Sequence, residues 1–115
     1  MKIRIKSNSL RYRLTKSDVD RLYKEGYLEE TTDFGTQQLT YSIKRHAFPD
    51  LTASFENNAI TLYMPSGMVN ELANTEKVGF AATYGTLYLL VEKDFVCLDA
   101  VAEDQSDNYP NPLLS

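Results

Sequence analysis

The segment LTASFENNAITLYMP, residues 51–65, constrains the fold more than any other part of the sequence. Two runs of alternating apolar and polar residues flank Asn57-Asn58, and asparagine tolerates the positive φ angles of a type I′ turn. With that turn the apolar residues of both runs share one face, whereas a slip of one residue would separate them. The apolar pairs expected are Phe55 with Ile60, Ala53 with Leu62, and Leu51 with Met64. The sequence therefore predicts an antiparallel hairpin with one buried face.

Further strands are predicted on both sides of this hairpin. Apolar and polar residues alternate over 2–6, 10–14 and 39–45, and 27–35 reads as a strand ending in a turn. A second hairpin is expected around Tyr84-Gly85, with Phe80 opposite Leu89 and Val78 opposite Val91. Its second strand is apolar on both faces, which is typical of a central strand that is covered on both sides.

Two short helices are also predicted. The first spans about residues 15–26, where Thr15 or Ser17 is suited to cap the amino end and Gly26 to end the helix. The second covers 67–74, with Ser66 as its expected cap. No internal repeat is recognisable. The predicted fold class is α+β, a mostly antiparallel bent sheet or partly closed barrel of six to eight strands with two short helices.

Charge is distributed unevenly along the chain. Residues 1–24 carry eight basic and two acidic residues, although the whole chain has a net charge of −4. The alternation in the first two strands places five of these cations on polar strand faces. They are the candidate anion- or partner-binding residues: Lys2, Arg4, Lys6, Arg11 and Arg13.

Several interpretations of these cations remain open. They can bind an acidic partner, they can be an outer face paired with the chain's own acids, or they can bind a small phosphorylated ligand as a binder or hydrolase. The last alternative requires them to converge in a pocket, for example inside a closed sheet. Nucleic acid is not expected as a partner, because the sequence pI of about 4.9 is low for a nucleic-acid-binding domain.

Catalytic and metal-binding patterns are weak. Cys97 and His46 are the only cysteine and histidine, so a structural zinc site lacks ligands, and a Cys97–His46 pair is a minor alternative to simple packing. Phosphate-binding glycine motifs are absent. We therefore predict no catalytic residues, no metal and no cofactor. The sequence also has no apolar run of membrane-spanning length and no signal-peptide pattern, which leads us to expect a cytoplasmic protein that does not enter a membrane.

The carboxyl-terminal segment has a composition of its own. We divide the chain into a single α+β domain, residues 1–98, and an acidic segment, residues 99–115, that we expect to pack as a strap. Tyr109 and Pro110 are the candidate anchors of the strap, with Pro112, Leu113 and Leu114 beyond them. The strap is expected to cover the chain's own basic strands or those of a second subunit, which would make a homo-oligomer.

Three stretches together carry a resemblance to known proteins: KIRIKSNSLRYRLTKSDV, SFENNAITLYMP, and the ending LVEKDFVCLD…EDQSDNYPNP. The chain resembles a small family of uncharacterised bacterial proteins, a domain of unknown function, over nearly its whole length. The resemblance implies a stand-alone domain to which the carboxyl-terminal motif belongs. It implies no activity and no functional residues.

Overall fold

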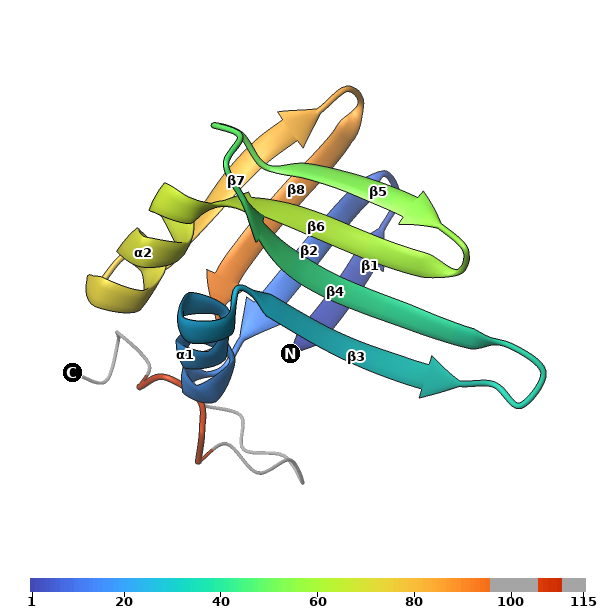
Figure 1. The fold of residues 1–115 in the computed structure, drawn as a ribbon, viewed down its shortest axis with the longest axis horizontal. Helices are drawn as coiled ribbons and strands as arrows, with labels where there is room; N and C mark the ends of the chain where they lie inside the picture. The colour runs from blue at the N-terminus through green and yellow to red at the C-terminus, as the bar shows by residue number, and fades with distance from the viewer. Residues whose placement is uncertain (96–105, 111–115) are drawn as a thin grey trace.

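The computed structural model describes residues 1–95 and 106–110, which form two four-stranded sheets and two helices (Figure 1). Sheet A has the strand order β1 (Lys2–Lys6), β2 (Ser9–Leu14), β8 (Leu87–Lys93) and β7 (Gly79–Tyr84). Sheet B has the order β3 (Tyr27–Asp33), β4 (Gln38–His46), β6 (Ala59–Pro65) and β5 (Thr52–Glu56). The helices α1 (Lys16–Glu25) and α2 (Ser66–Asn74) lie side by side at one end of the sheets.

The predicted α+β class is confirmed, with eight strands and two helices. Within that class the strands form two separate sheets, and neither sheet closes into a barrel. Each sheet is mixed, because its two central strands run parallel: β2 pairs with β8, and β4 pairs with β6. Periodicity cannot reveal these pairings, since it indicates hairpins between consecutive strands and says nothing about partners far apart in the chain.

The hairpin registers test the sequence reasoning directly. The central hairpin is confirmed for Phe55 with Ile60 and for Ala53 with Leu62, and Asn57 and Asn58 both have positive φ. Leu51 precedes β5, so its predicted pairing with Met64 falls outside the register of the hairpin. The register predicted for the β7–β8 hairpin is wrong by two residues: Phe80 faces Val91, and the turn residues are Gly85 and Thr86. A slip of two keeps every side chain on the same face, so alternation alone could not detect the error.

The two helices begin in different ways. Thr15 caps α1: its hydroxyl accepts from the backbone of Asp18, whose carboxylate accepts from the backbone of Thr15. Gly26 ends α1 with a φ of +76°, as predicted. The prediction that Ser66 caps α2 is wrong, because Ser66 is the first helical residue and its hydroxyl donates to the carbonyl of His46.

One core fills the space between the sheets and beneath the helices. The inner faces of the strands supply most of it, and each helix adds one valine and one leucine. Tyr12 and Leu89 from sheet A and Ile43 and Leu62 from sheet B are each fully buried. Removal of this apolar surface from water is the main stabilisation of the fold.

The second half of the chain repeats the topology of the first. β1–β2–α1–β3–β4 and β5–β6–α2–β7–β8 follow the same order, and each half contributes one hairpin to each sheet. Adding 50 to the residue numbers of the first half reproduces the hairpin registers of the second, so that Lys2↔Arg13 corresponds to Thr52↔Tyr63. The repeat is not recognisable in the sequence, because the two halves share burial patterns more than residue identities.

Candidate anion-binding face

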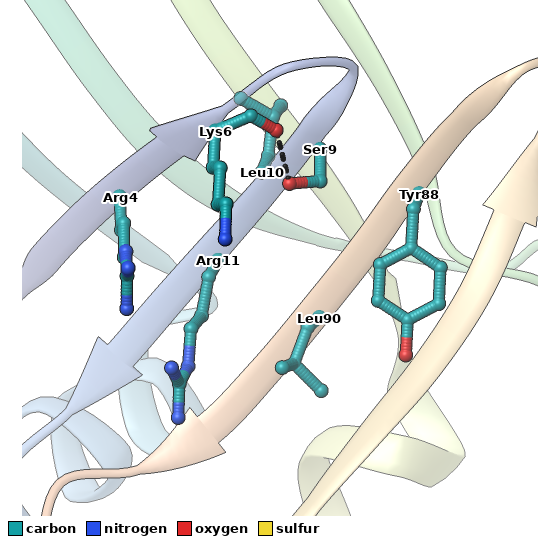
Figure 2. A pocket seen from close by; sticks show the side chains of 7 residues that line it. All are labelled: Arg4, Lys6, Ser9, Leu10, Arg11, Tyr88 and Leu90. Atoms are coloured by element: carbon teal, nitrogen blue, oxygen red, sulfur yellow. Dashed lines mark hydrogen bonds between the residues drawn. The ribbon is translucent and has the colours of Figure 1, made fainter.

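The five predicted cations lie together on the outer face of sheet A. Alternation along β1 and β2 turns Ile3, Ile5 and Tyr12 inward, so the charged residues between them point outward. Figure 2 shows Arg4, Lys6 and Arg11 on the same side of the sheet, next to Tyr88 and Leu90 of β8. We call this surface the cation face, formed by the side chains of Lys2, Arg4, Lys6, Arg11 and Arg13.

Like charges face each other across the β1–β2 hairpin. Arg4 lies directly opposite Arg11, and Lys2 lies directly opposite Arg13. Opposite positions on an antiparallel pair are close enough for like charges to destabilise the pairing. The cation face therefore carries an electrostatic cost that nearby acids, or a bound anion, can offset.

The protein's own acids neutralise part of this face. Glu92 is the single acid in the four strands of sheet A, and it forms ion pairs with Arg11 and Arg13. Asp94 lies 3.1 Å from the amine of Lys2, measured between Oδ2 and Nζ. Arg4 and Lys6 form no ion pair with any acid in the described part of the chain, and both are exposed.

The repeated topology supplies an internal reference for these charges. The β5–β6 hairpin has the same register as β1–β2, but its equivalent outward positions hold Thr52, Ser54, Glu56, Thr61 and Tyr63. Hairpin formation in this fold consequently does not require cations at these positions.

The cation face is shallow rather than enclosed. Arg4, Lys6, Arg11 and Ser9 line a depression of about 240 Å³ with Leu10, Tyr88 and Leu90 around them (Figure 2). This volume is below the range of about 300–1,000 Å³ that is usual for small-molecule pockets. The idea that the cations converge inside a closed sheet is wrong, since they point away from the core. The expectation that β8 is covered on both sides is also wrong, because Tyr88 is 44% exposed on this face.

The described part of the carboxyl-terminal segment, residues 106–110, lies against helix α1 and the end of β8. The carboxylate of Asp107 accepts hydrogen bonds from the backbone and hydroxyl of Ser17, and its backbone carbonyl accepts from Lys16. Hydrogen bonds from Thr15 and Ser17 hold the pKa of Asp107 below its ordinary value. Asp107 thus pairs with the amino end of α1, where an acid is favoured, and not with the cation face.

The two predicted anchors lie beside the end of β8 and line the same cavity. Tyr109 donates its backbone N–H to the carbonyl of Asp94 at 2.8 Å, and its ring contacts the ring of Phe95 with centroids 5.9 Å apart. The cavity that Tyr109 and Pro110 share has a volume of about 490 Å³. The other acids of the segment, Asp99, Glu103 and Asp104, lie outside the described residues, as do Pro112, Leu113 and Leu114.

Sequence reasoning missed Lys93, which lies at the base of this docked segment. Its amine donates to the carbonyl of Thr75 at 3.0 Å and lies 4.9 Å from the centre of the Tyr109 ring. Burial lowers the pKa of Lys93, while the charge of Glu76 acts in the opposite direction. The alternation of β8 places Lys93 on the same side as Leu89 and Val91, and that pattern could have indicated its burial.

The minor catalytic alternative gains no support from the described residues. His46 lies at the end of β4, where its Nδ1 accepts from the backbone of Phe48 and its ring contacts Tyr63. Cys97 lies outside the described residues. Among the residues described, no group of three or more histidine, cysteine, aspartate or glutamate side chains is placed to hold a metal.

Comparison with known proteins gives a family and no activity. No curated protein and no solved structure matches the chain. In the described part of the chain, none of the helices has the length and apolar character needed to span a bilayer. A family model described as "Family of unknown function (DUF7009)" matches residues 1–113, so nearly the whole length of the chain is covered. The chain therefore belongs to this family of unknown function.

Proposed function

We propose that this chain is a non-enzymatic binding protein whose cation face holds an acidic partner. The observation that carries the proposal is the contrast between two equivalent hairpins: β1–β2 carries five outward cations where β5–β6 carries mostly uncharged residues in the same register. Opposed like charges cost stability, and the fold forms the second hairpin without them. Binding of acidic groups supplies a reason for their presence.

The geometry favours an extended acidic partner over a compact ligand. Arg4 and Lys6 have no acid beside them in the described residues, whereas Arg11 and Arg13 share Glu92. Individual exposed ion pairs contribute only about 0–1 kcal/mol, so useful affinity needs several of them along one surface. A peptide with successive acidic side chains can span the row of cations in this way.

The test uses a fluorescently labelled decaglutamate peptide and measures its anisotropy at low and moderate salt. We expect the wild-type protein to bind it, with affinity that falls as salt increases. The variant Arg4→Ser/Arg11→Thr, which carries the residues of the equivalent hairpin, should lose up to about tenfold in affinity. Lys44→Thr, an exposed change on the outer face of sheet B, is the matched control. Absence of wild-type binding, or an equal loss in the control, would refute the proposal.

The same experiment separates a foreign partner from the chain's own acidic segment. If residues 99–104 cover the cation face, the variant Asp99→Asn/Glu103→Gln/Asp104→Asn should bind the peptide more tightly than the wild type. If the partner is another molecule, this variant and the wild type should bind equally. A homo-oligomer through this segment predicts in addition that the variant has a smaller hydrodynamic size.

A small phosphorylated ligand is the second candidate. The two guanidinium groups and the amine around the depression are suited to phosphate, which arginine binds in a bidentate manner. Thermal shifts with pyrophosphate and ATP test this candidate. A rise in melting temperature that Arg4→Ser/Arg11→Thr abolishes would favour it, and no shift with either compound would exclude it.

A further inference from the structure

A second pocket opens between the two sheets, at the end opposite to the helices. Its volume is about 600 Å³, within the range usual for small-molecule sites. Both sheets line it: sheet A through the inward faces of β1, β2, β7 and β8, and sheet B through the inward faces of β4, β5 and β6. Ser54 also lines it, from an outward position on the edge strand β5. The lining residues are Ile5, Leu10, Leu39, Ala53, Ser54, Phe55, Ile60, Tyr84 and Leu87.

The pocket lies where the two halves of the chain meet. Ile5 and Phe55 are equivalent under the shift of 50 residues, as are Leu10 and Ile60, and all four line this one pocket. Sites between related units are common places for ligands, because both units contribute walls to one concavity. The pocket is therefore a product of the repeat and not an accidental gap at the surface.

The lining is apolar and unusually exposed. None of the nine lining residues carries a charge, and the hydroxyls of Ser54 and Tyr84 are the polar side-chain groups among them. Ile5 is 57% exposed, Phe55 is 68% exposed and Tyr84 is 50% exposed. Large apolar side chains gathered around one concavity mark a surface that gains free energy when it is covered.

Residues of opposite charge follow the two equivalent lining residues Ile5 and Phe55. Lys6 follows Ile5 at the end of the edge strand β1, and no acid in the described residues pairs with it. The equivalent residue Glu56 follows Phe55 at the end of the edge strand β5. A long lysine side chain at a strand edge can reach a group at the mouth, so the side formed by β1 attracts an anion and the side formed by β5 repels it.

We infer that this pocket binds a small amphipathic molecule with one hydrocarbon chain and an anionic head group. The chain lies between the sheets against Leu10, Leu39 and Ile60, and the head group lies at the mouth on the side of Lys6. Lys6 belongs to the cation face, and Leu10 also lines the depression there, but the site depends on different observations, namely the volume, the apolar lining and the repeat. It can therefore exist whether or not the cation face binds an acidic peptide.

Binding of 11-(dansylamino)undecanoic acid, followed by dansyl fluorescence, tests the site in the intact protein. We expect saturable binding of one probe per chain and displacement by dodecanoate, dodecyl phosphate and 1-dodecanol. Inorganic phosphate should not displace the probe. Stronger displacement by dodecanoate than by dodecyl phosphate identifies a carboxylate head group, and the reverse order identifies a phosphate. Absence of wild-type binding, or displacement by inorganic phosphate alone, would overturn the inference.

Two substitutions test the apolar part. Ala53→Phe places a large side chain into the pocket and should reduce probe affinity at least about tenfold. Phe55→Ser removes an exposed wall residue, so it should weaken binding while leaving the melting temperature nearly unchanged, which keeps the test valid if Ala53→Phe does not fold. Unchanged affinity in Phe55→Ser would count against the assignment.

Two neutral substitutions test the head group. Lys6→Gln should weaken dodecanoate binding and Glu56→Gln should strengthen it, each by up to about fivefold, while 1-dodecanol binds equally to both. The competing occupant of the pocket is a second copy of the chain, and sedimentation velocity tests for it by measuring the oligomeric state. If the wild type is a dimer that Phe55→Ser converts to monomers, the pocket is an interface and the inference is wrong.

Discussion

The outer faces of the two sheets share one architecture and differ in chemistry. On sheet A the β1–β2 hairpin presents lysine and arginine, and on sheet B the equivalent β5–β6 hairpin presents mainly serine, threonine and tyrosine. Since both hairpins have the same turn length and register, the backbone does not explain the difference. The folding of this architecture therefore does not depend on these charges. Three further comparisons test how far the two halves are alike: two between equivalent positions of the repeat, and one between the starts of the two helices.

The largest effect is expected at Gly79, whose equivalent in the first half is Glu29. A Cβ at Gly79 would lie 2.5 Å from the carbonyl oxygen of Val91 and 2.8 Å from the Cβ of Glu92, whereas the equivalent position in sheet B holds a full side chain. Gly79→Ala should lower the free energy of unfolding by about 1–3 kcal/mol in urea titrations. Gly67 lies inside α2, and a Cβ added there would meet no atom within 4 Å other than those of the adjacent residues and the helix backbone. Gly67→Ala should therefore be neutral or stabilising. Equal losses in both variants would contradict the clash expected at Gly79.

A smaller effect is expected at the helix starts. Thr15→Ala removes the side-chain half of a reciprocal cap and should cost about 1 kcal/mol of unfolding free energy. Ser66→Ala should cost less than about 0.5 kcal/mol, because Ser66 is exposed and makes no cap for α2. Thermal unfolding of the two variants beside the wild type measures the difference. A larger loss at Ser66 would contradict the assigned roles.

The smallest effect is expected at Tyr12, whose equivalent in sheet B is Leu62. The Tyr12 hydroxyl is buried without a hydrogen-bond partner among the described residues, and burial, with the nearby Tyr41, raises its pKa. Tyr12→Phe should therefore be neutral, or stabilising by up to about 1 kcal/mol, at pH 8.

The pH dependence of this variant follows from the raised pKa. An unfolded tyrosine releases its proton near pH 10.0, while folded Tyr12 still holds its own, so wild-type stability falls as the pH rises above 10. Tyr12→Phe should lose less stability than the wild type between pH 8 and 10.5. The other tyrosines are the same in both proteins, so their titration does not contribute to this difference. Parallel melting curves for the two proteins across this range would contradict the assigned burial of the hydroxyl.

Local pattern was enough to predict the elements and the candidate site. Alternation identified the strands and the outward row of cations, and the Thr15 and Gly26 signals identified the limits of α1. The same pattern failed at Ser66, because a serine at a helix start can be the first helical residue as well as its cap. It also failed at the Phe80–Val91 register, because a shift of two residues preserves alternation.

The arrangement of the elements in space could not be predicted from the sequence, for a different reason. Parallel pairing of β2 with β8 joins residues such as Leu10 and Leu89. The residues of each strand do not indicate which distant strand it pairs with. The fifty-residue repeat was hidden because Arg4 and Ser54, or Lys6 and Glu56, have unlike side chains at equivalent positions. The pocket between the sheets follows from this arrangement, so it too was unpredictable from the sequence.

The pairing of β2 with β8 also sets the order in which the protein can assemble during synthesis. All four strands of sheet B lie between residues 27 and 65, so that sheet can form as soon as this stretch has left the ribosome. Sheet A cannot be completed until β8, residues 87–93, has been made, and the β1–β2 hairpin lacks its partner strand until then. Because contacts between distant residues form slowly, we expect folding in two stages, with docking of the first hairpin as the late and rate-limiting event.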